Sequence, residues 1–163
     1  MGRALVGGLL AQGLAPDALI VVEIDAGARE RIAREYGVAI ADQITTDVVR
    51  GADVLVLAVK PQGLRQTAAM LAPHLTGQLV ISIAAGIRLV DLSRWLGNYA
   101  RIVRAMPNTP ALIRRGITGL FANPTVSQDE RRQAEDILAA VGQTLWCERE
   151  QQLDAVTAVS GSG

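Results

Sequence analysis

Aromatic side chains are scarce in this sequence. Phe, Trp and Tyr make up 3% of its 163 residues, whereas hydrophobic residues of all kinds make up 50%. The core must therefore be filled by Val, Ile, Leu and Ala, which suits parallel strands buried on both faces between Ala-rich helices. At this length one domain with a core of its own is expected.

Cysteine, an excess of one charge and long apolar runs are lacking as well. Cys147 is the single cysteine, so no disulfide can form within the chain, and a reducing cytoplasm is expected. The 16 basic residues balance the 16 acidic ones and form no basic face, which argues against a nucleic-acid partner. No apolar run approaches the about 20 residues that span a bilayer, and no secretory signal opens the chain, so no membrane partner is expected.

Metal ligands and activated nucleophiles are also missing from the pattern. His74 has no Cys or acidic residue at metal-ligand spacing, and no Gly-x-Ser-x-Gly, Walker or zinc motif occurs. Cys147 has no neighbouring base, so a buried structural thiol is expected rather than a nucleophile. The sequence therefore predicts no metal site.

What the sequence does contain is an alternation of short apolar runs with helical segments. Strands are predicted over residues 19–24, 38–41, 54–59, 79–83, 101–105, 117–122 and 144–147. Helices are predicted over residues 2–13, 26–36, 45–50, 61–75, 89–96, 127–141 and 150–159. This order predicts an α/β, Rossmann-like doubly wound fold with a mostly parallel sheet flanked by helices and joined by right-handed crossovers.

The order of elements departs from that fold at its start. A dinucleotide-binding sheet begins with a strand, a glycine-rich turn and a helix, whereas this sequence begins with the helix. The first strand of such a sheet lies in its middle, so without it a gap with unpaired edges is predicted. We expect residues upstream of Met1 in the native protein, or another segment that fills the gap.

Three short motifs each follow a predicted strand: residues 59–62 (VKPQ), 82–86 (SIAAG) and 106–110 (MPNTP). Loops at the same ends of neighbouring parallel strands line one crevice, where open α/β sheets bind ligands. Lys60 would place a cation at the mouth of this crevice, and Pro61 suits the first turn of a helix. Taken alone, Lys60 favours a solvent-facing strand end, and the neighbouring motifs reverse that preference.

The other two motifs offer small residues and an amide. Ala84, Ala85 and Gly86 would let a nicotinamide-ribose lie against the backbone, although a tight turn between a strand and a helix explains them as well. Two prolines stiffen the loop around Asn108, whose amide suits recognition of a carboxamide or an imine. The alternative is that Asn108 satisfies the backbone of its own loop.

Asp25 ends the first visible strand. A carboxylate there can accept hydrogen bonds from the adenosine ribose of a dinucleotide, or it can cap the following helix, and both can hold at once. Glu23 and Asp25 together form a negative patch that should repel a 2′-phosphate, which Arg29 and Arg31 would offset. The choice between NADPH and NADH therefore stays open.

Five segments in order resemble pyrroline-5-carboxylate reductase over essentially the whole chain. They are residues 1–5 (MGRAL), 58–62 (AVKPQ), 82–86 (SIAAG), 104–110 (RAMPNTP) and 156–163 (VTAVSGSG). This family reduces the cyclic imine 1-pyrroline-5-carboxylate to L-proline with hydride from NADPH or NADH, the last step of proline biosynthesis. By this resemblance Asn108 belongs to the loop nearest the reacting centre.

The resemblance also implies the cofactor-binding residues: Met1, Gly2, Asp25, Thr45, Ala58, Val59, Lys60, Pro61, Ala84, Ala85 and Gly86. Met1 resembles the Met of a Gly-x-Gly-x-Met loop whose glycines do not occur here. Thr45 stands where many members have an Asn that contacts the cofactor.

In domain terms, the resemblance implies an NAD(P)-binding domain over residues 1–150 and the start of a helical domain over residues 151–163. In the family that second domain forms a dimer and supplies substrate-binding and proton-donating groups. A homodimer or higher homo-oligomer is therefore expected for the full-length protein, and negligible turnover for these residues alone. The alternatives are another imine or hydroxyacid dehydrogenase of the same superfamily and a degenerate, non-catalytic nucleotide-binding module.

Overall fold

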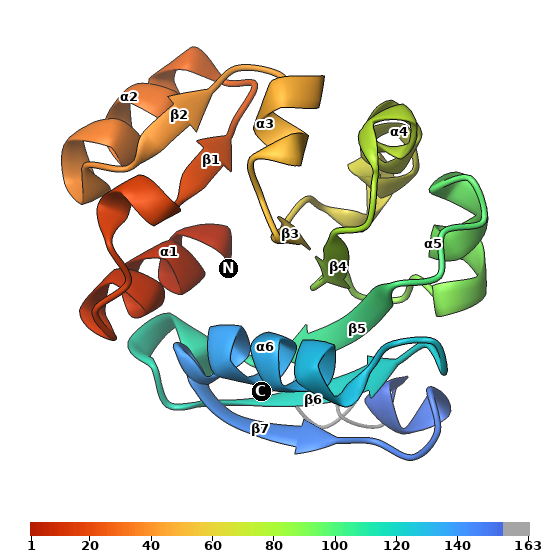
Figure 1. Ribbon diagram of the computed structural model, residues 1–163. Helices are drawn as coiled ribbons and strands as arrows, with labels where there is room; N and C mark the ends of the chain where they lie inside the picture. Colours follow the sequence, from red (N-terminus) through yellow and green to blue (C-terminus); the bar gives the residue numbers. More distant parts are fainter. Residues whose placement is uncertain (155–163) are drawn as a thin grey trace.

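The computed structural model describes residues 1–154, and within them the strands form two sheets (Figure 1). The smaller sheet pairs β1 (Ile20–Val22) with β2 (Ala39–Ala41). The larger sheet has the order β3-β4-β5-β6-β7, with β3 Val54–Leu57, β4 Leu79–Ser82, β5 Ile102–Pro107, β6 Gly116–Ala122 and β7 Gly142–Trp146. All pairs are parallel except β5 with β6, which confirms the predicted mostly parallel sheet.

Helices cover both faces of the larger sheet. The helices are α1 Gly2–Ala11, α2 Ala26–Tyr36, α3 Thr46–Arg50, α4 Pro61–Leu71, α5 Leu89–Trp95 and α6 Gln128–Ala139, with short 3-10 turns η1 Pro16–Ala18, η2 Ala72–His74 and η3 Thr109–Ile113. Side chains alternate along the strands. Leu79 and Ile81 of β4 therefore pack in one core with α1 and α6, whereas Val80 packs in a second core with α4 and α5.

Local signals in the sequence set the helix ends. Asp25 accepts a hydrogen bond from the Ala28 N–H at 2.6 Å at the start of α2, and Gly37 ends that helix in the left-handed conformation at φ 65°. The helix predicted to run to residue 75 ends earlier, at Leu71, and continues as the 3-10 turn η2 that contains Pro73. Proline cannot donate the hydrogen bond that an α-helix interior needs, which explains the change.

The predicted break in the sheet lies between β1 and β3. No strand pairing joins the two sheets within residues 1–154. The apolar side chains of Ile20 and Val22 remain 45% and 37% exposed along β1, and Ile24 beyond it is 84% exposed. Exposed β-branched residues on an unpaired strand edge are unusual, because such edges invite further pairing.

Two predictions about the loops need correction. The strand predicted to reach residue 59 ends at Leu57, so Ala58 and Val59 already belong to the loop. Conversely, Met106 and Pro107 are not loop residues but the last residues of β5, since that strand stays paired with β6 as far as Thr118. Pro107 is tolerated because it closes the strand.

Residues 151–154 form the start of the predicted last helix. The rest of that helix and the motif at 156–163 lie outside the described residues. None of the helices within residues 1–154 has the length and apolar character needed to cross a membrane.

Glu130 stabilises the N-terminus of α6 from within the protein. Its carboxylate accepts hydrogen bonds from the Ser127 N–H and hydroxyl, both at 2.8 Å, and from Arg101 Nε at 2.6 Å. Burial by itself raises the pKa of Glu130, but the contacts with Ser127 and Arg101 outweigh it and hold the pKa below its ordinary value.

Replacing Glu130 with Gln should lower the free energy of unfolding by about 1–2 kcal/mol at neutral pH, because the capping box and the ion pair are both weakened. Since the folded pKa lies below the ordinary 4.5, ionised Glu130 stabilises the fold above that value, and the stabilisation is lost as the pH falls through the folded pKa. Urea unfolding near pH 7 and near pH 3 measures this. The difference in free energy of unfolding between wild type and Glu130→Gln should be smaller near pH 3. A gap of equal size at both pH values would contradict this assignment.

Candidate functional site

Three loops open at one edge of the larger sheet. The register pairs Leu57, the last residue of β3, with Ser82, the last of β4, and Ser82 with Arg104 of β5, which continues to Pro107. Neighbouring strands lie about 4.8 Å apart. The loops that follow them therefore open at the same edge of the sheet, where the three sequence motifs predict a ligand crevice.

Lys60 stands at the entry to this crevice. It precedes Pro61, the first residue of α4, and it is exposed together with Ala58 and Val59. Lys60 is the only lysine of the sequence. Within residues 1–154 its ammonium makes no ion pair or hydrogen bond, so it is available to an anionic ligand.

The second loop brings backbone close to the crevice. Ala84 is 3% exposed and belongs to the core, Ala85 is half-buried, and Gly86 is exposed at φ 74°. No atom lies within 4 Å of the place that a Cβ on Gly86 would take. Gly86 thus supplies a left-handed turn and leaves free space beside it, whereas Ala84 is a packing residue.

The third loop is fixed by Asn108. Its Oδ1 accepts a hydrogen bond from the Ile117 N–H at 2.9 Å, which joins the end of β5 to the start of β6. The alternative weighed from the sequence, an Asn that satisfies its own loop, is therefore present. Because an N–H must meet an oxygen, the amide nitrogen Nδ2 points away from Ile117, and it makes no hydrogen bond within residues 1–154.

Asp25 lies at the carboxyl end of β1, in the separate two-stranded sheet. Its Oδ1 caps α2, and the second oxygen is left for a ligand. Arg29, which the sequence offered as an offset to the negative patch at Glu23 and Asp25, donates from NH1 to the carbonyls of Glu23 at 2.9 Å and of Ile24 at 2.8 Å. Its guanidinium is therefore held just beyond the end of β1, beside the backbone of the patch.

The remaining predicted cofactor residues are placed as follows. Met1 precedes α1, and a Cβ on Gly2 would lie 3.2 Å from the Cβ of Ala58, so the start of α1 adjoins the first crevice loop. Thr45 caps α3 by accepting from the Val48 N–H at 3.3 Å. That capping bond gives Thr45 a structural role that needs no cofactor.

A buried ion pair between β5 and the segment after β7 was missed from the sequence. Arg104 in β5 is 2% exposed and contacts Glu150. The signal was present, because a single arginine interrupts the apolar run of residues 102–106. A charge buried in a central strand needs a partner, and that partner is remote in sequence.

Two other expectations from the sequence concern the Cys147 thiol and metal ligands. Burial raises the pKa of the Cys147 thiol, which lowers its reactivity and fits a structural role. Within the part of the chain that the structure describes, no group of three His, Cys, Asp or Glu side chains is arranged to hold a metal ion.

Comparisons relate the chain to known proteins. Residues 1–86 match the family model described as NADP oxidoreductase, coenzyme F420-dependent. The chain belongs to this family. Among curated proteins it is similar to the pyrroline-5-carboxylate reductase of Pseudomonas aeruginosa, at 46% identity over 100% of this chain and 60% of that protein.

Solved structures agree with this assignment. The pyrroline-5-carboxylate reductase from Coxiella burnetii has a TM-score of 0.93 at 40% identity, covering 99% of this chain and 60% of that one. The Plasmodium falciparum pyrroline carboxylate reductase with NADP bound has a TM-score of 0.86 at 26% identity, covering 100% of this chain and 59% of that one. The predicted resemblance and the Rossmann-like fold are therefore confirmed. The chain spans about 60% of the length of the curated relatives that it matches.

Proposed function

We propose that this chain forms the cofactor-binding part of a reductase that converts 1-pyrroline-5-carboxylate to L-proline with hydride from NADPH or NADH. The observation that carries the proposal is the placement of Lys60, Gly86 and Asn108 on three loops at one sheet edge. The similarity to pyrroline-5-carboxylate reductases over the whole chain supports it.

The residues divide the work by their chemistry. Gly2, Ala58, Val59, Lys60 and Pro61 would hold the phosphate and ribose groups, and Lys60 would pair with a phosphate. Ala84, Ala85 and Gly86 would flank the nicotinamide side, while Met1, Asp25 and Thr45 would border the rest of the dinucleotide. When bound, the nicotinamide ring supplies the hydride.

Asn108 would act at the reacting centre. Its Oδ1 is occupied by Ile117, so its Nδ2 is the group that can donate to the substrate or to the nicotinamide carboxamide. A hydrogen bond there would orient the imine carbon for hydride addition. The proton for the imine nitrogen would come from a second domain, whose start we place at residues 151–163 after a cofactor domain over residues 1–150.

Location and assembly belong to the same proposal. A cytoplasmic enzyme is supported by the lone cysteine Cys147, which allows no disulfide within the sequence. A homodimer or larger homo-oligomer is supported by the resemblance to the reductase family.

The experiment is an assay of NADPH and NADH oxidation by the protein as its gene encodes it, with 1-pyrroline-5-carboxylate as substrate and proline measured as product. We expect proline formation that depends on the imine. Cofactor oxidation with a 2-oxo acid but not with the imine would identify a hydroxyacid dehydrogenase. No binding of either cofactor would identify a non-catalytic module.

Asp25 provides a prediction about cofactor choice. Replacing Asp25 with Ser should raise kcat/KM for NADPH relative to NADH roughly tenfold, because one negative charge beside the 2′-phosphate is removed. Serine is as good a helix cap as aspartate, so α2 should keep its N-terminus. Steady-state kinetics with both cofactors measures the ratio. An unchanged ratio would mean that Asp25 caps α2 without facing the cofactor.

A further inference from the structure

Arg104 is the most deeply buried charge among residues 1–154. It lies in β5, the central strand of the larger sheet, between Ser82 of β4 and Phe121 of β6. Its side chain is 2% exposed and points to the face that α4 and α5 cover, since its neighbour Ile102 packs in that core. Such a charge is tolerated only with partners close by.

The partners come from the segment that follows β7. Arg104 NH1 lies 3.0 Å from Glu150 Oε1, and Arg104 NH2 lies 3.2 Å from Asp154 Oδ1. Leu153 between them is 0% exposed. The segment is therefore fixed to the centre of the sheet by an apolar and an ionic contact.

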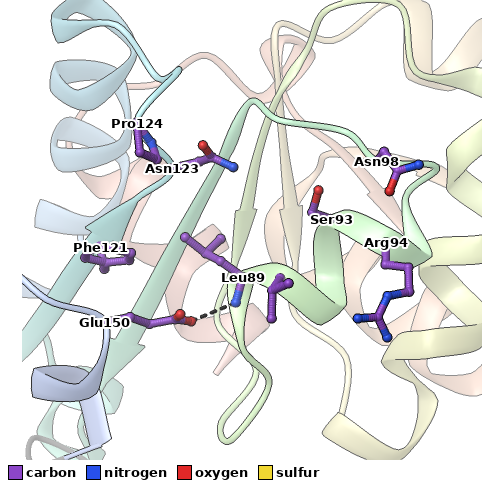
Figure 2. Close-up of a pocket in the computed structure, with 9 residues that line it drawn as sticks. Leu89, Ser93, Arg94, Asn98, Phe121, Asn123, Pro124 and Glu150 are labelled. Carbon is purple, nitrogen blue, oxygen red and sulfur yellow. Dashed lines mark hydrogen bonds between the residues drawn. The ribbon is translucent and has the colours of Figure 1, made fainter.

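The same oxygen of Glu150 makes a second contact. Glu150 Oε1 accepts a hydrogen bond from the Leu89 N–H at 2.7 Å, and Leu89 is the first residue of α5 (Figure 2). Figure 2 shows the Glu150 side chain pointing toward the start of α5. A groove of about 400 Å³ lies here, with Leu89 and Ser93 of α5 on one side and Phe121 and Asn123 on the other. One carboxylate oxygen thus joins β5 to the start of α5.

Both residues that contact Glu150 Oε1, Leu89 and Arg104, are close in sequence to a crevice loop. Leu89 is three residues beyond Gly86, in the second crevice loop, and Arg104 is four residues before Asn108, in the third. Neither Arg104 nor Glu150 belongs to any of the three crevice loops. Their shared contact links β5, which leads into the third loop, to the start of α5, which follows the second loop.

We propose that Arg104 and Glu150 are positioning residues, which hold the Gly86 turn in register with Asn108 through the bridging oxygen of Glu150. The kinetic effects expected from this proposal rest on the proposed reductase function, whereas the expected change in hydrogen exchange does not. Removing the bridge should loosen the start of α5 and misalign the two loops, leaving the contacts around Lys60 intact. The expected loss therefore falls on kcat rather than on the KM for the dinucleotide.

The test combines hydrogen exchange with kinetics on the protein as its gene encodes it. Glu150→Ala should raise amide exchange at Leu89 at least tenfold in the absence of any ligand, because the acceptor of that N–H is gone. It should lower kcat about tenfold and change the KM for NADPH or NADH less than twofold. Arg104→Lys, which keeps the charge, should keep most of kcat.

Two further variants separate positioning from simple stability. Arg101→Gln breaks another ion pair, with Glu130, at the residue just before the same strand, and should leave exchange at Leu89 and kcat unchanged. Arg104→Met/Glu150→Ala removes both charges, so its thermal stability should exceed that of Glu150→Ala. Its kcat should stay low, because the bridge to Leu89 is still missing.

Unchanged exchange at Leu89 in Glu150→Ala would overturn the proposal. A double variant with wild-type kcat would overturn it as well, since the pair would then serve stability alone. If the wild-type protein fails to reduce the imine, the reductase function falls, whereas the exchange data still decide whether Glu150 holds α5.

Discussion

Replacing Asn108 with aspartate is expected to lower kcat for imine reduction about a hundredfold, the usual effect of losing one donor at a reacting centre. The change is nearly isosteric. One carboxylate oxygen can still accept the Ile117 N–H, so the loop between β5 and β6 keeps its closure. What is lost is the donor Nδ2, which is replaced by an oxygen that cannot donate.

Asn123 supplies the matched control. It is also a loop asparagine whose Oδ1 accepts from a backbone N–H, that of Thr125, but it lies at the other end of β6. Asn123→Asp should leave kcat and both KM values within about twofold of wild type, because it is remote from the reacting centre. Equal kinetics for Asn108→Asp and wild type would remove Asn108 from the reaction and leave it as a loop residue.

The second large effect concerns stability. Replacing Gly142 with alanine should lower the free energy of unfolding by more than about 3 kcal/mol. Gly142 has φ 145°, and a Cβ there would lie 2.0 Å from the carbonyl oxygen of Gly116 and 2.5 Å from its nitrogen. Both atoms are backbone within the pairing of β6 with β7, so relief requires the strands to separate.

Gly63 is the control for Gly142. It lies in α4, and a Cβ there would meet no atom within 4 Å. Gly63→Ala should therefore be neutral or stabilise by up to about 1 kcal/mol, since alanine favours the helix. Urea or thermal unfolding of both variants measures the contrast. A Gly142→Ala protein as stable as wild type would show that β6 and β7 approach less closely than described.

Local chemistry explains which parts of the fold were predictable. Asp25, Gly37, Pro61 and the Ser127–Glu130 capping box act on their own helices, and each helix begins or ends where its signal stands. The positions of the strands along the chain needed only the apolar runs and their spacing. The gap beside β1 was predictable as well, because it follows from the order of elements rather than from side-chain detail.

The parts that were not predictable depend on contacts between remote residues. The reversal of β6 against β5 rests on pairing across the loop at 108–115, which no local signal specifies. Met106 and Pro107 belong to β5 only because β6 pairs with them. The bridge from Arg104 to Glu150 joins residues 46 positions apart, which a reading of neighbouring residues does not connect.

The candidate site follows the same division. The placement of the three motifs at one edge was predicted because each follows a strand of a parallel sheet. The hydrogen bonds of Asn108 and Arg29, in contrast, required the folded structure. Those bonds bear on the chemistry, since they leave the Asn108 amide nitrogen without a partner within residues 1–154 and hold the Arg29 guanidinium beside Glu23.

The most direct test of the account follows deuterium from the nicotinamide ring. The protein as its gene encodes it is incubated with 1-pyrroline-5-carboxylate and NADPH or NADH deuterated at the transferable position, and proline is examined by mass spectrometry and NMR. The account predicts one deuterium on the former imine carbon, which is Cδ of proline. Unlabelled proline, or cofactor oxidation without proline, would contradict hydride transfer at this crevice.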